Sequence, residues 1–333
     1  MKKKIQWGKF SKPMILVAFV IILTILRPDS FPTLGNISNV LWSVSVYGIM
    51  VCGTIFVFLV GGIDLSIGSL CGLSAVVIVK TIHAFGDTEG GVAAGIMAAL
   101  LVGALAGVIH GFVITKFKVP AFLVTFATSS IFLGLSMVLT NNKIISCLGP
   151  DLFTAIGMMK ILGFPIPIYV MLIIAIVSWF VLRKTPFGRY MYAIGGNPAA
   201  ARLSGINDTG LTFLAYIFSG ISTALGGIVL ASMTQQCMAS TGSGYETEVI
   251  TAAVIGGVSL LGGEGTVPGA IFGAVIIGLL NNGLNLMSVP STEHGLVKGI
   301  VIIAAVAFDA LQHQDQAKKG FSFFSFGKSK KTA

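Results

Sequence analysis

The chain has 333 residues and a formal net charge of +9, but only 10% of its residues are charged and 55% are apolar. Ordinary globular chains carry about 25% charged residues, so this composition excludes a water-soluble protein of this size. The positive charge does not indicate nucleic-acid binding, because no aromatic-interleaved basic face accompanies it. Instead, the basic residues concentrate near the two ends, as expected of membrane topology signals and contacts with anionic lipid.

Apolar runs long enough to cross a membrane recur along the chain. A crossing helix needs about 20 apolar residues, and continuous rather than alternating runs favour helices over barrel strands. The sequence therefore predicts an all-α, polytopic transmembrane helical bundle with about ten spans. We place them near 10–28, 38–60, 66–84, 91–114, 119–140, 165–182, 209–233, 246–262, 268–289 and 295–311.

The distribution of basic residues sets the expected orientation. Five lysines precede the first span, five follow the last, and the loops near 116–118 and 183–208 carry six more basic residues. By the positive-inside rule these segments are cytoplasmic. We expect a multi-pass plasma (inner) membrane protein with a cytoplasmic N-terminal tail at 1–12 and a cytoplasmic C-terminal tail at 312–333.

A weak internal repeat links the two halves. The segment "LVGGIDLSIGSL" (59–70) aligns with "LLGGEGTVPGAI" (260–271) at an offset of 201 residues. The same offset carries the first span onto the seventh and the fourth onto the tenth. Both copies run in the same direction, so the pattern predicts a parallel repeat of the kind found in transporters.

One polar stretch interrupts the apolar runs, "GRYMYAIGGNPAAARLSGIN" at 188–207. Asn197 is a good N-cap, Pro198 suits the first helical position, and Gly205 can end the helix. These signals predict a helix of about seven residues, too short to be stable alone in water. It must therefore dock, either on the membrane surface or on a partner protein.

Four motifs carry a family resemblance from about residue 35 to 311: "VGGIDLSIGSL", "KFKVPAFLVTFAT", "FGRYMYAIGGNPAAARLSGIN" and "GYETEVITAAVIGGVSLLGGEGTVPGAIFGAVIIGLLNNGLNL". Together they resemble the permease subunits of ribose/xylose/galactoside-type ABC sugar importers, in the branched-chain amino acid/ribose permease superfamily. The resemblance implies a transmembrane permease domain at 13–311 and alternating access without a cofactor. It implies as partners a cytosolic ABC ATPase subunit, a second permease subunit, identical or paralogous, and an extracellular sugar-binding protein.

The resemblance also assigns a coupling loop at 183–208, whose helix fits a cleft in the ATPase. The matching positions are Gly188, Arg189, Gly195, Gly196, Asn197, Pro198, Ala200, Ala201 and Gly205. The chain itself lacks a P-loop, because Ser322 stands where the motif ending in "GKS" (327–329) requires its first glycine. ATP must therefore be hydrolysed by another chain.

Several polar residues within spans are candidates for the substrate pathway. Asp64 either lines it or caps the helix that follows through Ser66. Asn281, Asn282 and Asn285 form one amide stripe that could contact sugar hydroxyls or join helices. Thr125 belongs to a weaker polar stripe with Thr128 and Ser129, which fits packing better than pathway.

No pattern indicates catalysis or a metal centre. His83, His110, His294 and His313 are scattered without ligand spacing, and no nucleophile–base pair is evident. Glu246 and Glu248 fit the favourable dipole at the start of a helix. Cys147 and Cys237 both fall in predicted outer loops, where a disulfide is an open alternative.

Two other function classes remain as alternatives. A self-sufficient secondary transporter or channel for a small polar solute explains the hydropathy and the repeat, but not a capped cytoplasmic helix. It would also normally use ionisable residues within its spans, of which this chain has few. An intramembrane enzyme lacks a set of residues to carry a reaction.

Overall fold

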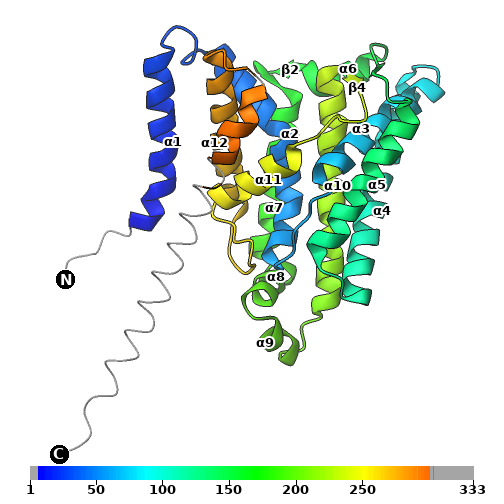
Figure 1. Ribbon diagram of the computed structural model, residues 1–333, viewed down its shortest axis with the longest axis vertical. Coiled ribbons are helices and arrows are strands. Elements are labelled where there is room, and N and C mark those ends of the chain that lie inside the picture. The colour runs from blue at the N-terminus through cyan, green and yellow to red at the C-terminus, as the bar shows by residue number, and fades with distance from the viewer. Residues whose placement is uncertain (1–6, 291, 301–302, 304–333) are drawn as a thin grey trace, which may run out of the picture.

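The computed structural model describes residues 7–290, 292–300 and 303, and it is a bundle of helices (Figure 1). The helices are α1 (Trp7–Leu26), α2 (Leu34–Leu59), α3 (Ile67–Ala84), α4 (Glu89–Phe117), α5 (Ala121–Thr140), α6 (Asp151–Met158), α7 (Ile166–Lys184), α8 (Pro186–Gly196), α9 (Pro198–Leu203), α10 (Asp208–Thr234), α11 (Tyr245–Ile255) and α12 (Val267–Leu286). Residues 292–300 are also helical.

Four two-residue strands complete the described elements. β1 (Ile145–Ser146) pairs antiparallel with β4 (Gln236–Cys237), and β2 (Lys160–Ile161) pairs antiparallel with β3 (Phe164–Pro165). Both pairs lie at one end of the bundle and α9 lies at the other (Figure 1). We call these the strand end and the α9 end.

Seven described helices are long and apolar enough to cross a membrane: α2, α3, α4, α5, α7, α10 and α12. The predicted span 246–262 is wrong as a continuous helix. α11 has only 11 residues, about 16 Å at 1.5 Å per residue, and 256–266 are not helical. The predicted first span corresponds to α1, whose described apolar part is the shorter segment Leu16–Leu26. Most of the predicted last span lies outside the described residues.

α2 occupies the centre of the bundle. Every residue from Val44 to Leu59 is buried, and the helix packs against α10, α12 and α7. α10 in turn packs against α4 and α3, and its backbone approaches that of α4 closely at Gly103, Gly107 and Gly220. Small residues allow such approach where lipid provides no hydrophobic drive between helices. The outer helices α4, α5 and α7 expose apolar side chains instead, as lipid-facing helices do.

The backbone leaves helical geometry within the bundle at 60–66, at 238–244 and at 256–266. In Figure 1 the first of these runs between the lower end of α2 and the start of α3. Irregular backbone at membrane depth is tolerated only where protein buries it or where it lines an aqueous cavity. In the first segment, the Gly61 and Gly62 amides donate to carbonyls in the last turn of α2, and the Leu65 amide donates to Thr125 Oγ1 at 3.1 Å.

The two aligned segments of the repeat have the same local form. Residues 60–66 lead into α3 at Ile67, and 256–266 lead into α12 at Val267. The two helix starts differ by 200 residues, one fewer than the sequence offset. A repeat extending beyond these two segments stays a prediction.

Candidate functional site

The helix predicted after Asn197 is present as α9. The Asn197 side chain accepts a hydrogen bond from the Ala200 amide at 3.0 Å, and Pro198 is the first helical residue. The helix ends where Gly205 adopts φ +79, which favours glycine, and the Ile206 amide donates back to the Ala201 carbonyl. The prediction from local capping signals is confirmed.

A second helix, α8, precedes α9 and was not predicted. It begins after Thr185, whose side chain accepts from the Gly188 amide, and Pro186 is its first residue. This pair is itself a helix-start signal that the sequence already carries. Asn197 ends α8 and begins α9, so 185–205 form two short helices joined at one residue.

α8 is anchored to the bundle by close backbone contact. A Cβ atom on Gly195 would lie 1.9 Å from the Leu59 carbonyl oxygen and 2.2 Å from the Gly263 nitrogen. The Gly263 amide itself donates to the Leu59 oxygen at 2.9 Å, and Tyr192 Oη donates to the Gly265 oxygen at 2.8 Å. The end of α8 therefore touches both aligned copies of the repeat motif, which meet at this point.

We call this meeting point the glycine junction. It comprises Gly61, Gly195, Gly196, Gly262 and Gly263, from three segments of chain. A Cβ atom on Gly262 would lie 2.9 Å from both the Gly195 Cα and the Gly61 nitrogen, and one on Gly263 would lie 2.7 Å from the Gly196 nitrogen. A shift of α8 would act directly on the two irregular segments that precede α3 and α12.

The predicted coupling residues divide into a buried set and an exposed set. Gly188 and Ala201 are buried and hold the two helices against the bundle. Arg189, Gly196, Asn197, Pro198, Ala200 and Gly205 are exposed and Gly195 is half-buried. Leu203, on α9, is 91% exposed at this end of the molecule. A single exposed apolar side chain is common on protein surfaces, so Leu203 marks an accessible position on α9 and is not by itself evidence of an interface.

Asp64 is 1% exposed and all its polar contacts are within the fold. One oxygen accepts from the Ser66 amide at 3.0 Å and from Ser66 Oγ at 2.7 Å, and the other accepts from Ser219 Oγ of α10 at 2.9 Å. These contacts fix the turn into α3 and tie it to α10. They support the capping interpretation over a direct contact with substrate.

Thr125 also faces protein. Its hydroxyl accepts from the Leu65 amide and donates to the Ala121 carbonyl at 2.9 Å. The neighbouring Thr128 lies 2.6 Å from His110 Nε2, and Ser129 lies 2.8 Å from Ser69. This polar stripe joins α5 to α3, α4 and the irregular segment, which supports packing.

The three asparagines of α12 have different surroundings. Asn282 exchanges two amide hydrogen bonds with Asn36 of α2, at 2.7 and 3.1 Å. Asn281 Nδ2 contacts Glu248 at 3.5 Å, and its Oδ1 has no partner among the described residues. Asn285 is exposed.

Glu248 and Lys298 were not predicted as a pair. Lys298 donates to Glu248 Oε1, and with Thr247, Thr251 and Ile277 they line a small cavity beside Asn281. Two opposite charges within predicted spans were the available signal, because such charges pair where lipid surrounds them. Asn285 is therefore the exposed asparagine of α12, and the Glu248–Lys298 pair is a mostly buried contact between α11 and the helical residues 292–300.

We expect Asn285 and Asn282 to respond differently to replacement by leucine. Asn285→Leu removes an exposed amide and should reduce transport while the protein stays folded. Asn282→Leu breaks the reciprocal pair with Asn36, worth about 0.6–2 kcal/mol in membranes, and should lower the melting temperature. Uptake assays and thermal unfolding of both variants separate the roles. Normal uptake by Asn285→Leu would remove this residue from the pathway.

Cys147 and Cys237 are free thiols, which answers the open question of a disulfide in this structure. Both are buried at the strand end, on the paired strands β1 and β4 or next to them. Burial, with a smaller contribution from the nearby Cys147, raises the pKa of Cys237 to about 12. Protonated thiols exchange slowly with disulfides, because the thiolate is the nucleophile.

Comparison of the sequence with known proteins shows which family the chain is similar to. Residues 36–306 match the model of the branched-chain amino acid transport system / permease component family. The chain is 42% identical to the ribose import permease protein RbsC of Bacillus subtilis, over 88% of this chain and 90% of that protein. It is 39% identical to RbsC of Haemophilus influenzae over the same shares. It is 34% identical to the L-arabinose transport system permease protein AraH of Escherichia coli, over 94% and 93%.

No solved structure matches the chain. The family model covers most of the chain, and the relatives align over nearly their whole lengths. The chain therefore belongs to the branched-chain amino acid transport system / permease component family.

Proposed function

We propose that this chain is the membrane-spanning permease subunit of an ABC importer for a monosaccharide, a ribose-type pentose or a related sugar. The relatives named as ribose and L-arabinose permeases support the sugar class. The observation that carries the mechanism is the α8–α9 pair. Its outer side is exposed, including Leu203, and its inner side contacts both repeat segments.

In this proposal the ATPase binds the exposed face of α8 and α9 at the cytoplasmic, α9 end. Closure of the ATPase pair on ATP moves α8. The glycine junction passes the movement to 60–66 and 256–266, which precede α3 and α12. Irregular segments of this kind absorb backbone rotation more readily than continuous helices, and in transporters they lie beside the substrate path.

A second permease subunit faces the first across the pathway. The exposed Asn285 of α12 and the Glu248–Lys298 pair, which joins α11 to the helical residues 292–300, support this face as the pathway side. Neutral sugars need donors and acceptors rather than charge, which amides supply. An extracellular sugar-binding protein would deliver the sugar at the strand end.

The sugar is identified by reconstituting the permease with its ATPase and binding protein in proteoliposomes. ATP hydrolysis should rise with the transported sugar and not with other sugars. A panel of ribose, xylose, arabinose, galactose and branched-chain amino acids tests the class. Stimulation by an amino acid alone would replace the sugar proposal with amino-acid import.

We expect uptake to need ATP and not an ion gradient. Asp64 is hydrogen-bonded to Ser66 and Ser219, and Glu248 is paired with Lys298, so these charged groups are held in place rather than arranged as a relay. Uptake into proteoliposomes supplied with ATP on the ATPase side should persist when an uncoupler is added. If uptake falls with the gradient at constant ATP, the chain is a secondary transporter.

A further inference from the structure

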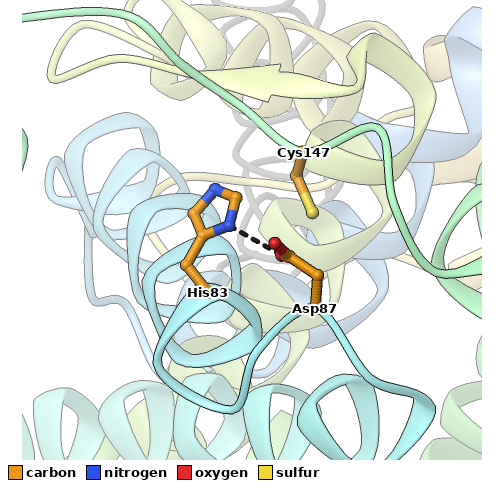
Figure 2. Close-up of side chains that lie close together, drawn as sticks. All are labelled: His83, Asp87 and Cys147. Carbon is orange, nitrogen blue, oxygen red and sulfur yellow. Dashed lines mark hydrogen bonds and ion pairs between the residues drawn. The ribbon is translucent and has the colours of Figure 1, made fainter.

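Three side chains from separate segments come together at the strand end, away from the glycine junction. His83 lies in the last turn of α3, Asp87 in the turn before α4, and Cys147 directly after β1. One nitrogen, oxygen or sulfur atom of each lies within 4.8 Å of the others. Figure 2 shows the sulfur of Cys147 directed toward the His83–Asp87 pair.

The hydrogen bonds of His83 determine its tautomer, and so whether the ring nitrogen next to Asp87 carries a proton or a lone pair. Nε2 lies 2.9 Å from the Ser146 carbonyl oxygen, which can only accept, so Nε2 carries the proton. Nδ1 then lies 2.7 Å from Asp87 Oδ1. In the neutral ring these are two acceptors facing each other, and they need a cation between or beside them. A proton would make an ion pair, whereas a metal ion would use both as ligands.

The arrangement around His83 is the one that metal-binding histidines use. Such a histidine donates its second ring N–H to a carbonyl or carboxylate, which sets the tautomer and the ring orientation. Here the Ser146 carbonyl has this role, next in sequence to the third candidate ligand.

The other two groups are held by backbone contacts. Asp87 has φ 55, uncommon for a residue with a side chain, and its amide donates to the Ile82 oxygen at 3.0 Å. The Cys147 amide donates to the Gln235 oxygen at 3.0 Å, which continues the β1–β4 pairing. Ligands fixed by the backbone in this way need little ordering when an ion binds.

We propose that His83, Asp87 and Cys147 bind a zinc ion at the strand end of the permease. Thiolate, imidazole and carboxylate are the side chains that Zn²⁺ takes, and three of them leave a fourth tetrahedral position for water. Tetrahedral bonds of about 2.0–2.3 Å place ligand atoms roughly 3.3–3.6 Å apart. To reach this spacing, the His83 Nδ1–Asp87 Oδ1 distance of 2.7 Å must open by about 0.6 Å, and the Cys147 sulfur must move inward by about 1 Å.

The ion would join two parts of the fold. His83 and Asp87 belong to the α3–α4 turn, and Cys147 continues the strand that pairs with β4. β4 leads into 238–244 and α11, so a bound ion would hold the entrance to α11 against α3. The side chains of His83 and Asp87 are 35% and 47% exposed, which gives an ion access from solvent.

The test uses the full-length permease in detergent, stripped with a chelator and then titrated with ZnCl2 or CoCl2. We expect one ion per chain, a higher melting temperature with zinc, and a thiolate-to-cobalt charge-transfer band. Cys147→Ser should abolish the band. His83→Ala removes a ligand and should weaken zinc binding by at least the roughly 10–100-fold that the loss of an outer-shell partner costs.

His294→Ala is the matched control, because His294 Nε2 also contacts a backbone carbonyl, that of Val289 at 3.0 Å. This variant should bind zinc like the parent. Retention of the cobalt band by Cys147→Ser, or no saturable binding by the parent, overturns the proposal. The band reports on the folded protein, so loss of some protein through misfolding does not obscure the result.

A disulfide is the competing use of Cys147. Thiol counting on the denatured, unreduced protein should find four thiols, as in the structure. Two thiols, with Cys237→Ser restoring the Cys147 thiol, would show a Cys147–Cys237 bond and overturn the zinc site. Metal binding is measured without transport, so this result is independent of whether the importer proposal holds.

Discussion

Replacing Leu203 with aspartate should release the ATPase from the permease without unfolding the permease. Leu203 is 91% exposed on α9, outside the span-length helices, so the substitution breaks no contact within the bundle. A charge placed in an apolar interface must be desolvated without a partner, and truncating a central apolar anchor costs 2 kcal/mol or more in many interfaces. We expect recovery of the ATPase with the tagged permease to fall at least about 30-fold.

Leu162→Asp is the matched control. Leu162 is 90% exposed in the β2–β3 turn at the strand end, so it has similar exposure at the opposite end of the molecule. Its variant should retain the ATPase.

Two bulkier changes test the surface around Leu203. Ala200→Trp should overfill the ATPase cleft, and Gly205→Val should change the direction in which the chain leaves α9, because Gly205 has φ +79. If the variants at Ala200, Leu203 and Gly205 all bind the ATPase and transport normally, α8 and α9 are only a surface segment without a coupling role.

The second large effect is expected at Gly195, the centre of the glycine junction. In Gly195→Ala the new Cβ atom would meet the Leu59 oxygen at 1.9 Å and the Gly263 nitrogen at 2.2 Å, both backbone atoms that cannot rotate away. Overpacking of this kind costs about 1–3 kcal/mol and here displaces α8 from both repeat segments. Thermal unfolding should show lower stability, and ATP hydrolysis should continue with less sugar moved per ATP.

The neighbouring glycine provides the control. A Cβ atom on Gly196 has nothing within 4 Å, so Gly196→Ala should change stability by less than about 0.5 kcal/mol. The two substitutions are at adjacent positions, but only the one at Gly195 places its Cβ atom against backbone atoms of other segments. Equal behaviour of Gly195→Ala and Gly196→Ala in both assays would contradict the close contact between α8 and the junction.

Features that depend on neighbouring residues were predictable from the sequence. Hydropathy alone identified the membrane class, because a crossing helix must bury about 20 consecutive apolar residues. The cap at Asn197 and the stop at Gly205 predicted α9, since both act on backbone groups within a few residues. Thr185 and Pro186 are the same kind of local signal, and they would have predicted the start of α8.

The prediction of one continuous span at 246–262 is wrong, and the reason lies in the tertiary structure. The segment is mostly apolar after Glu246 and Glu248 in its first turn, but the helix ends at Ile255, and further along the Gly263 amide donates to the Leu59 carbonyl of α2. Hydropathy indicates that a segment avoids water, but it does not distinguish a helix that crosses lipid from a segment that is buried within the protein.

The sequence by itself determined that the chain is a helical membrane protein with a capped helix outside its apolar spans, because hydropathy and capping act over short distances. Only the tertiary structure decided which polar residues meet. It paired Asn282 with Asn36 across 246 positions, bonded Asp64 to Ser219, and brought Cys147 to His83 and Asp87. Such contacts depend on how the helices pack, and the packing is set by the close fit of many small residues rather than by the spacing of the residues that finally touch.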